Sequence, residues 1–229
     1  MSKSSKRMAV NRESIDSNQH YSLDEAISLL KKTSNAKFNE TIDIAINLGI
    51  DAKKSDQNVR GSMVLPNGTG KTLRVIVFAQ SEQVDAAKNA GADKVGFEDL
   101  AEEIKSGFSA FDVVIATPDT MRIVGQLGKI LGPKGMMPNP KDGTVTKNVE
   151  DAVIKAKTGQ IRFRNDKGGV VHCPIGKIDF SEESIKENLE SLLGAIMKSK
   201  PSSAKGAFIK KVTVSSTMGP GITIDHSTI

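Results

Sequence analysis

Apolar residues follow two different rhythms along this chain, and the change between them constrains the fold more than any single motif. From Ile42 to Leu48 every second residue is isoleucine or leucine, which is typical of a strand with one buried face. The segment 73–79 is instead almost continuously apolar, as are strands covered on both faces. Beyond Gly159 the alternating rhythm returns. The two chain ends and the chain middle are therefore expected to form different kinds of sheet.

The middle of the chain alternates short apolar segments with amphipathic ones. Besides the strand at 73–79, the pattern predicts short strands around Val95, at 112–116 and at 144–146, and helices at 82–90, 98–106, 121–131 and 148–157. Strands that alternate with helices pair in parallel through right-handed crossovers. This part of the chain is expected to be a three-layer, Rossmann-like α/β/α domain.

The two chain ends carry helix signals between their alternating strands. Ser22 and Glu25 form a capping-box pattern at the start of a short helix, and Ser181 suits the cap of a longer helix that reaches Met197. Further strands are expected at 61–65, 161–164, 170–175 and 208–215.

The fold class is therefore α/β with two domains. Residues 1–67 and 160–229 are expected to form one discontinuous, two-layer α/β domain with a mostly antiparallel sheet, into which 68–159 is inserted. Charge supports this division. The end segments together carry 20 Lys and Arg against 15 Asp and Glu, whereas the insert carries 12 of each. Since the whole net charge of +5 lies on the discontinuous domain, that domain is the expected anion-binding surface.

The first residues, up to Gln19, are polar and aperiodic and include Arg7 and Arg12. We expect them to stay mobile until an anionic partner orders them, although a solvated tail without a role explains them equally well.

Several classes of function are disfavoured by the sequence. His20, His172 and His226 are scattered, and no histidine and carboxylate recur at metal-ligand spacing, so no metal site is expected. The lone Cys173 excludes an internal disulfide framework and suits a reducing cytosol. No apolar run could span a bilayer, and the start lacks the apolar stretch of a signal peptide. A cytoplasmic protein without membrane contact is expected.

One segment keeps a nucleotide-binding enzyme as the alternative. Gly68–Thr72 ends in Gly-Lys-Thr, as a phosphate-binding P-loop does, with Lys71 in the lysine position. A P-loop also needs a glycine where Leu65 stands and a helix after Thr72, whereas a strand follows. The turn 80–82 lacks the glycines of a dinucleotide site. We therefore expect neither catalysis nor a cofactor.

Three segments offer chemistry for an anionic partner. The loop 132–143 combines stiffening prolines with glycines and with Lys134 and Lys141, although a merely rigid loop would have the same composition. Arg164 and the arginine two residues earlier fall on one face of a strand, where an ordinary solvated face is the alternative. The segment 215–221 gathers hydroxyls and glycines at a strand end, which suits ribose and phosphate.

Five segments together carry a family resemblance: Lys37-Phe-Asn-Glu-Thr41, Ser55-Asp-Gln-Asn-Val-Arg-Gly61, Gly132-Pro-Lys-Gly-Met-Met-Pro-Asn-Pro140, Phe163-Arg-Asn-Asp-Lys167 and Ser216-Thr-Met-Gly-Pro220. In this order, they resemble the family of the bacterial large-subunit ribosomal protein L-one, the protein of the mobile stalk beside the ribosomal exit site. The resemblance covers nearly the whole chain and implies the same two-domain fold, without catalysis.

The resemblance also implies partners. Family members bind a structured segment of large-subunit ribosomal RNA chiefly through the discontinuous domain, assist the release of deacylated transfer RNA, and in many bacteria repress translation of their own messenger RNA. A monomer when free, located on the large ribosomal subunit in the cytoplasm, is expected. Carried over by motif, the RNA-binding residues are expected to lie side by side on one surface: Lys37, Phe38, Glu40, Thr41, Arg164, Asp166, Lys167, Ser216, Thr217, Met218 and Gly219. Lys134 and Lys141 are candidates for a secondary contact. Because Glu40 and Asp166 are acidic, we expect them to orient basic side chains or to accept hydrogen bonds from ribose or base.

Overall fold

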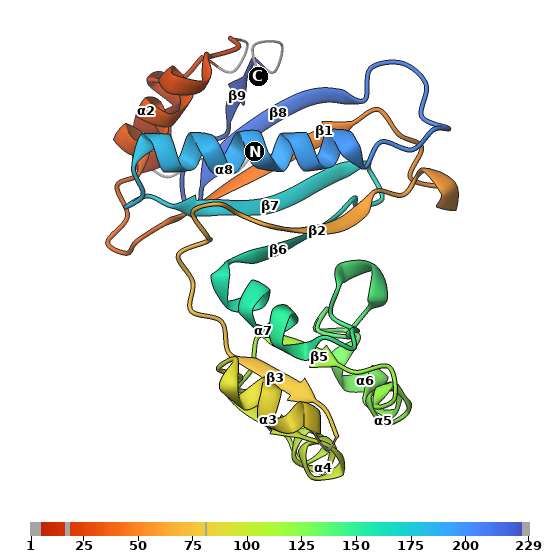
Figure 1. Cartoon of the computed structure of the whole chain (residues 1–229). Coiled ribbons are helices and arrows are strands. Elements are labelled where there is room, and N and C mark those ends of the chain that lie inside the picture. Colours follow the sequence, from red (N-terminus) through yellow and green to blue (C-terminus); the bar gives the residue numbers. More distant parts are fainter. Residues whose placement is uncertain (1–5, 17–18, 81, 226–229) are drawn as a thin grey trace. The chain divides into compact units, whose positions relative to one another are not determined.

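A computed structural model describes residues 6–16, 19–80 and 82–225 of the chain (Figure 1). The chain divides into two compact units: Met1–Gly70 together with Ile161–Ile229, and Lys71–Gln160. The chain leaves the first unit after Gly70, three residues later than the expected boundary at 67. The reason is that the glycines at this boundary pack on the first unit. Asn188 Nδ2 donates a hydrogen bond to the Gly68 carbonyl at 3.1 Å, and a Cβ atom on Gly70 would lie 3.1 Å from the Phe180 ring.

A four-stranded antiparallel sheet forms the frame of the first unit. Its order is β7-β1-β8-β9, and Ile44 of β1 lies between Cys173 and Val214. The strands are β1 (Thr41–Leu48), β7 (Val170–Lys177), β8 (Ile209–Ser216) and β9 (Ile222–Ile224), and a separate pair consists of β2 (Arg60–Val64) and β6 (Gln160–Arg164). The alternation in β1 is confirmed, since its isoleucines are buried while Asn47 is exposed.

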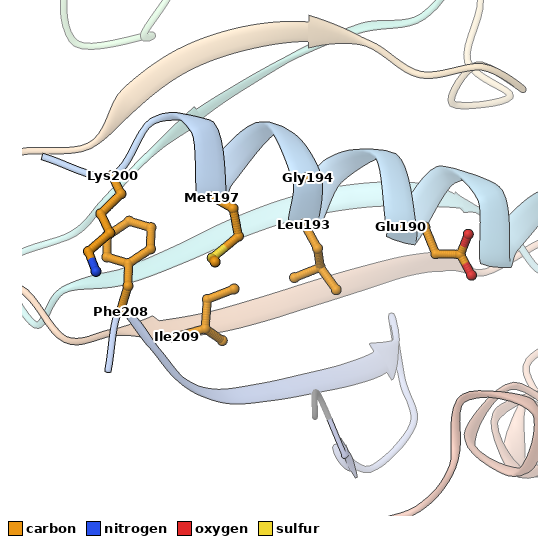
Figure 2. A pocket seen from close by; sticks show the side chains of 7 residues that line it. All are labelled: Glu190, Leu193, Gly194, Met197, Lys200, Phe208 and Ile209. Atoms are coloured by element: carbon orange, nitrogen blue, oxygen red, sulfur yellow. The ribbon is translucent and has the colours of Figure 1, made fainter. Parts of the chain in front are cut away.

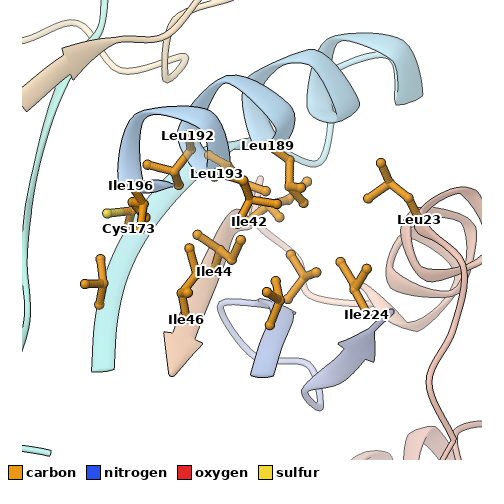
Figure 3. Close-up of a cluster of buried hydrophobic side chains, with 14 of the residues drawn as sticks. Leu23, Ile42, Ile44, Ile46, Cys173, Leu189, Leu192, Leu193, Ile196 and Ile224 are labelled. Atoms are coloured by element: carbon orange, nitrogen blue, oxygen red, sulfur yellow. The ribbon is translucent and has the colours of Figure 1, made fainter. Parts of the chain in front are cut away.

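Helices α2 (Leu23–Thr33) and α8 (Glu182–Lys198) cover one face of this sheet. Both caps behave as predicted: Ser22 and Glu25 form a reciprocal capping box, and Ser181 accepts from the Ser184 amide. Figure 3 shows α8 leucines and isoleucines pointing at the β1 isoleucines in a single core. Side chains at alternate positions of β1, β7 and β8 face away from these helices, which leaves the second face of the sheet polar.

The second unit is a three-layer α/β/α domain, as expected. Its parallel sheet has the order β4-β3-β5, with β3 (Val75–Phe78), β4 (Lys94–Gly96) and β5 (Val113–Ala116). Every residue of β3 and β5 is buried. Ile76 and Phe78 join a core with α4 (Glu98–Lys105), α5 (Met121–Gln126) and α6 (Gly128–Leu131), while Val75 and Val77 join another with α3 (Glu82–Asn89) and α7 (Val149–Thr158).

The expectation of a mobile first segment is wrong for its described part, because Lys6–Glu13 forms helix α1. Tertiary contacts explain it: the buried Asn11 donates through Nδ2 to the Thr33 carbonyl at the end of α2 (2.9 Å), and Ile15 joins the core.

Three smaller differences concern short elements. The expected helix 121–131 is divided at Leu127 into α5 and α6, and the expected strand at 144–146 is reduced to a single bridge between Val145 and Ala116. The sequence patterns did not predict strand β9 or the 3-10 turns Ser55–Gln57 and Pro140–Asp142. No helix in the described ranges is long and apolar enough to cross a bilayer.

Candidate nucleic-acid interface

The start of β1 and the end of β8 bring two of the sequence motifs together. Ile42 pairs with Ser216, and beyond this pair the Thr217 amide donates to the Thr41 carbonyl at 3.0 Å. The Thr217 hydroxyl continues the ladder, because its oxygen accepts from the Thr41 amide at 3.0 Å and donates to the Thr41 carbonyl at 3.2 Å. Segments 176 positions apart in sequence thus form one rigid edge.

Glu40 lies beneath this edge rather than on it. Its side chain is 2% exposed, and Oε2 accepts from Ser216 Oγ and from the Met218 amide, both at 2.8 Å. Oε1 accepts from the Ala36 amide at 3.2 Å. Burial raises the pKa of Glu40, but these hydrogen bonds, with the charge of nearby Arg7, outweigh burial and leave its pKa lowered. Glu40 is therefore an anion that holds the loop after β8 in place.

Strand parity explains which hydroxyls and side chains are exposed. Ser216 shares the core side with Ile42 and is 4% exposed, whereas Ser215 faces the other side of the sheet. Phe38 and Met218 are large apolar side chains with 54% and 47% of their surface exposed. We call the set formed by these motifs the strand-end surface: Lys37, Phe38, Thr41, Thr217, Met218 and Gly219, with Glu40 and Ser216 beneath.

Gly219 closes the loop tightly. A Cβ atom at this position would lie 2.5 Å from Ser216 Oγ, the hydroxyl that binds Glu40, so a side chain here would displace the anchor. The loop therefore presents bare main chain next to Met218.

Helix α1 adds residues to the strand-end surface that the sequence interpretation assigned to a tail. Arg7 Nη2 donates to the Met218 carbonyl at 3.3 Å, and Arg12 is exposed about one and a half turns further along the helix. The two arginines were noticed in the sequence, but nothing local placed them beside residues more than 200 positions away.

The predicted residues Arg164, Asp166 and Lys167, here called the hairpin group, lie at the opposite end of β1. They occupy the end of β6 and the turn into β7, where Val170 pairs with Asn47. Asn47 is six residues from Thr41, or about 20 Å along an antiparallel strand. The structure thus separates the predicted site into two groups joined by one strand.

The hairpin group has its own fixed geometry. Asp166 Oδ1 accepts from the Gly168 and Val170 amides at 2.8 Å each, and the Val170 and Gly168 bonds are the main cause of the lowered pKa of Asp166. His172 Nε2 lies 3.9 Å from Asp166 Oδ2. Arg164, Asp166 and Lys167 are all exposed, so the turn offers two cations to solvent beside a carboxylate that is bound to its own main-chain amides.

The two predicted lysines of the insert belong to the other unit. Lys134 and Lys141 are exposed on the loop 132–143, which Asn139 stiffens by accepting from the Lys141 amide at 2.9 Å. Met136 and Met137 pack on the core of that unit rather than facing outward.

The glycine-rich segment 68–72 is not a P-loop. It leads directly into strand β3, so it lacks the helix that a P-loop requires.

An apolar groove runs along the second half of α8 and the start of β8 (Figure 2). It has a volume of about 480 Å³, and its lining residues are Glu190, Leu193, Gly194, Met197, Lys200, Phe208 and Ile209. Lys200 Nζ lies 5.9 Å from the centre of the Phe208 ring. Because Phe208 precedes β8 and Thr217 follows it, the groove lies at the far end of the strand from the strand-end surface.

Two strand-end groups of cations, hydroxyls and open main chain lie on an α/β unit that is interrupted by a parallel α/β/α insert. These features fit a protein that binds an anionic partner. Among the described residues no three His, Cys, Asp or Glu side chains are placed to hold a metal ion.

The family follows from comparison with known proteins. The family model described as "Ribosomal protein L1p/L10e family" matches residues 30–220, and the chain belongs to this family. Over 229 residues it is 61% identical to the "Large ribosomal subunit protein uL1" of Vibrio vulnificus (strain YJ016) and to that of Tolumonas auensis, covering 100% of this chain and 98% of each relative. Members of the family are structural, non-enzymatic ribosomal proteins of the cytoplasm, which agrees with the sequence expectation.

Proposed function

We propose that this protein binds a structured segment of large-subunit ribosomal RNA through the strand-end surface. The observation that carries the proposal is the buried Glu40 carboxylate, which fixes the Met218 main chain and leaves the side chains around it exposed. A site ordered in advance loses less conformational entropy when it binds.

The hydroxyl of Thr217 has one acceptor position left for RNA. A hydroxyl has one proton and two lone pairs. The proton goes to the Thr41 carbonyl, and one lone pair accepts from the Thr41 amide. The remaining lone pair suits a ribose 2′-hydroxyl, the group that distinguishes RNA from DNA.

The other exposed groups complement this contact. Lys37 meets phosphate, Phe38 and Met218 offer apolar contact to a base or ribose, and Gly219 admits the RNA backbone. The hairpin group supplies a second contact about 20 Å away along β1. Two separated contacts select for an RNA of a particular shape, since both must be met at once.

A filter-binding titration with the ribosomal RNA segment tests the proposal. Met218→Asp places a carboxylate on the surface and is expected to weaken binding at least tenfold, whereas Met197→Asp, an equally exposed methionine on α8, is the matched control and should bind as the wild type does. Equal affinities of the two variants would overturn the proposal.

We further propose that the same surface represses translation of the protein's own messenger RNA, when that RNA offers the same fold, and that the protein assists release of deacylated transfer RNA from the exit site. For transfer RNA the exposed Lys134 and Lys141 of the insert are the candidate contacts. A gel-shift comparison of transfer RNA binding by the wild type and by the double alanine variant of these lysines tests this second part. A free monomer, expected for the unbound protein, is checked by light scattering.

A further inference from the structure

A cavity adjoins the strand-end surface between α1 and the loop that follows β8. Its volume is about 510 Å³, and it is lined by Met8, Arg12, Ile15, Gly219, Pro220 and Gly221. Cavities of 300 to 1,000 Å³, roughly, are those that hold small ligands.

The wall formed by α1 is anchored independently of any ligand. Asn11, 5% exposed, hydrogen-bonds to the Thr33 carbonyl, and Ile15 is part of the core. Arg7 bonds to the Met218 carbonyl and so ties this helix to the opposite wall.

The opposite wall is equally fixed. Val214 pairs with Ile222 across the turn, a Cβ atom on Gly221 would lie 3.0 Å from the Thr213 methyl group, and Glu40 holds the Met218 amide. The space between the walls is therefore a built pocket.

The two walls differ in chemistry in a way that suits a nucleotide. One wall has the apolar Met8 and Ile15 beside the guanidinium of the exposed Arg12. The other wall is the main chain of Gly219, Pro220 and Gly221, which carries no side chain except the proline ring. Unpaired bases in RNA are bound by flat apolar surfaces and by guanidinium planes, and phosphate is bound by arginine.

We propose that this pocket holds one unpaired nucleotide of the bound RNA, with its base between the two walls and the Arg12 guanidinium stacked on the base. The inference rests on the proposed RNA binding and deepens it. A duplex cannot enter a cavity of this size, and a free phosphate would leave the apolar wall uncovered. One nucleotide matches both the volume and the two chemistries.

An abasic scan of the RNA tests the pocket. Each unpaired nucleotide of the ribosomal RNA segment is replaced in turn by an abasic one, and affinity is measured for the wild type, Arg12→Ala and Arg12→Lys. At one position we expect the abasic change to weaken wild-type binding about tenfold and to leave the binding of Arg12→Ala unchanged, because base and guanidinium act as a pair. Arg12→Lys should behave as Arg12→Ala does, since lysine has the charge without the plane. Lys32→Ala, an exposed cation on α2, is the control that should retain the full abasic effect.

A fluorescent base gives a direct readout. With 2-aminopurine at the position found by the scan, the wild type should change its fluorescence on binding, and Arg12→Ala should not. If no position shows an abasic effect that depends on Arg12, or if Arg12→Lys restores the abasic effect in full, the pocket assignment is wrong. Failure of the wild type to bind the intact RNA would instead overturn the proposed function, so the two failures are distinguishable.

Discussion

The main-chain amide of Met218 donates a 2.8 Å hydrogen bond to Glu40 Oε2, across 178 positions of the chain. A carboxylate thus lies directly beneath a surface that we propose for RNA, a polyanion. The arrangement is stable because three donors bind the carboxylate: the Ala36 amide nearby in sequence, and the Ser216 hydroxyl and Met218 amide at the end of β8. A neutral side chain could not accept from all three.

Replacing Glu40 with glutamine tests this anchor. An amide accepts at one oxygen only, so its NH2 group would face the Met218 or Ala36 amide. We expect the first unit to lose about 1–3 kcal/mol of unfolding free energy and the variant to bind the RNA more weakly. Tyr21 is the only tyrosine, the chain has no tryptophan, and Tyr21 is buried in the first unit, so its fluorescence during urea denaturation reports that unit alone. Ser216→Ala, which removes one of the three bonds, should have a smaller effect. A Glu40→Gln variant as stable as the wild type would contradict the anchoring role.

The pH dependence of stability should carry the signature of the same carboxylate. The folded-state pKa of Glu40 is lowered, so its contribution is present above the unfolded-state pKa, near 4.3, and is lost as pH falls through the folded-state value. The stability difference between the wild type and Glu40→Gln should therefore shrink as pH falls from about 6 to 3. Parallel urea titrations of both proteins measure it, and a difference that grows on acidification would refute the assignment.

The hairpin group should contribute to RNA affinity through phosphate. We expect Arg164→Ala and Lys167→Ala each to reduce the slope of log affinity against log salt by about one unit. Lys198→Ala, on the last turn of α8, should leave the slope unchanged. Because the hairpin group lies about 20 Å from Thr41, its losses should add to that of Met218→Asp. Unchanged slopes would remove the hairpin group from the interface.

Cys173 should be inert in the folded protein. It is 2% exposed on β7, and burial first, then the charge of Asp43, raises the pKa of its thiol to about 12. Since the thiolate is the reactive form, a disulfide reagent at pH 8 should label Cys173 only after unfolding. The comparison is labelling with and without urea, and rapid labelling of the native protein would show that the strand opens locally.

Local patterns predicted the elements well where the cause is local. The alternation in β1, the capping box at Ser22 and the buried strands of the insert each follow from neighbouring residues. Helix α1 could not be predicted from neighbouring residues, because Asn11 and Ile15 stabilise it through contacts with distant parts of the chain. Strand β9, with three residues, is too short to have a period.

The candidate site was predicted as a single surface, and this prediction is wrong in its geometry, since the structure separates the residues into two groups. The motifs identified both groups, yet only the register of β7 on β1 shows that Asp166 and Thr217 lie at opposite ends of one strand. The burial of Glu40 could have been predicted from the alternation of the sequence. Positions 40, 42 and 44 share one side of the extended chain, and that side is the core.

The central position of β1 has a consequence for the order in which a newly made chain matures. Strand β1 lies between β7 and β8, and both of these strands are synthesised only after the insert. The insert is one continuous stretch of chain and can fold by itself. The loop after β8 can therefore be anchored to Glu40 only after Met218 has been synthesised. A chain whose synthesis has not yet reached Met218 therefore lacks the strand-end surface that we propose for RNA.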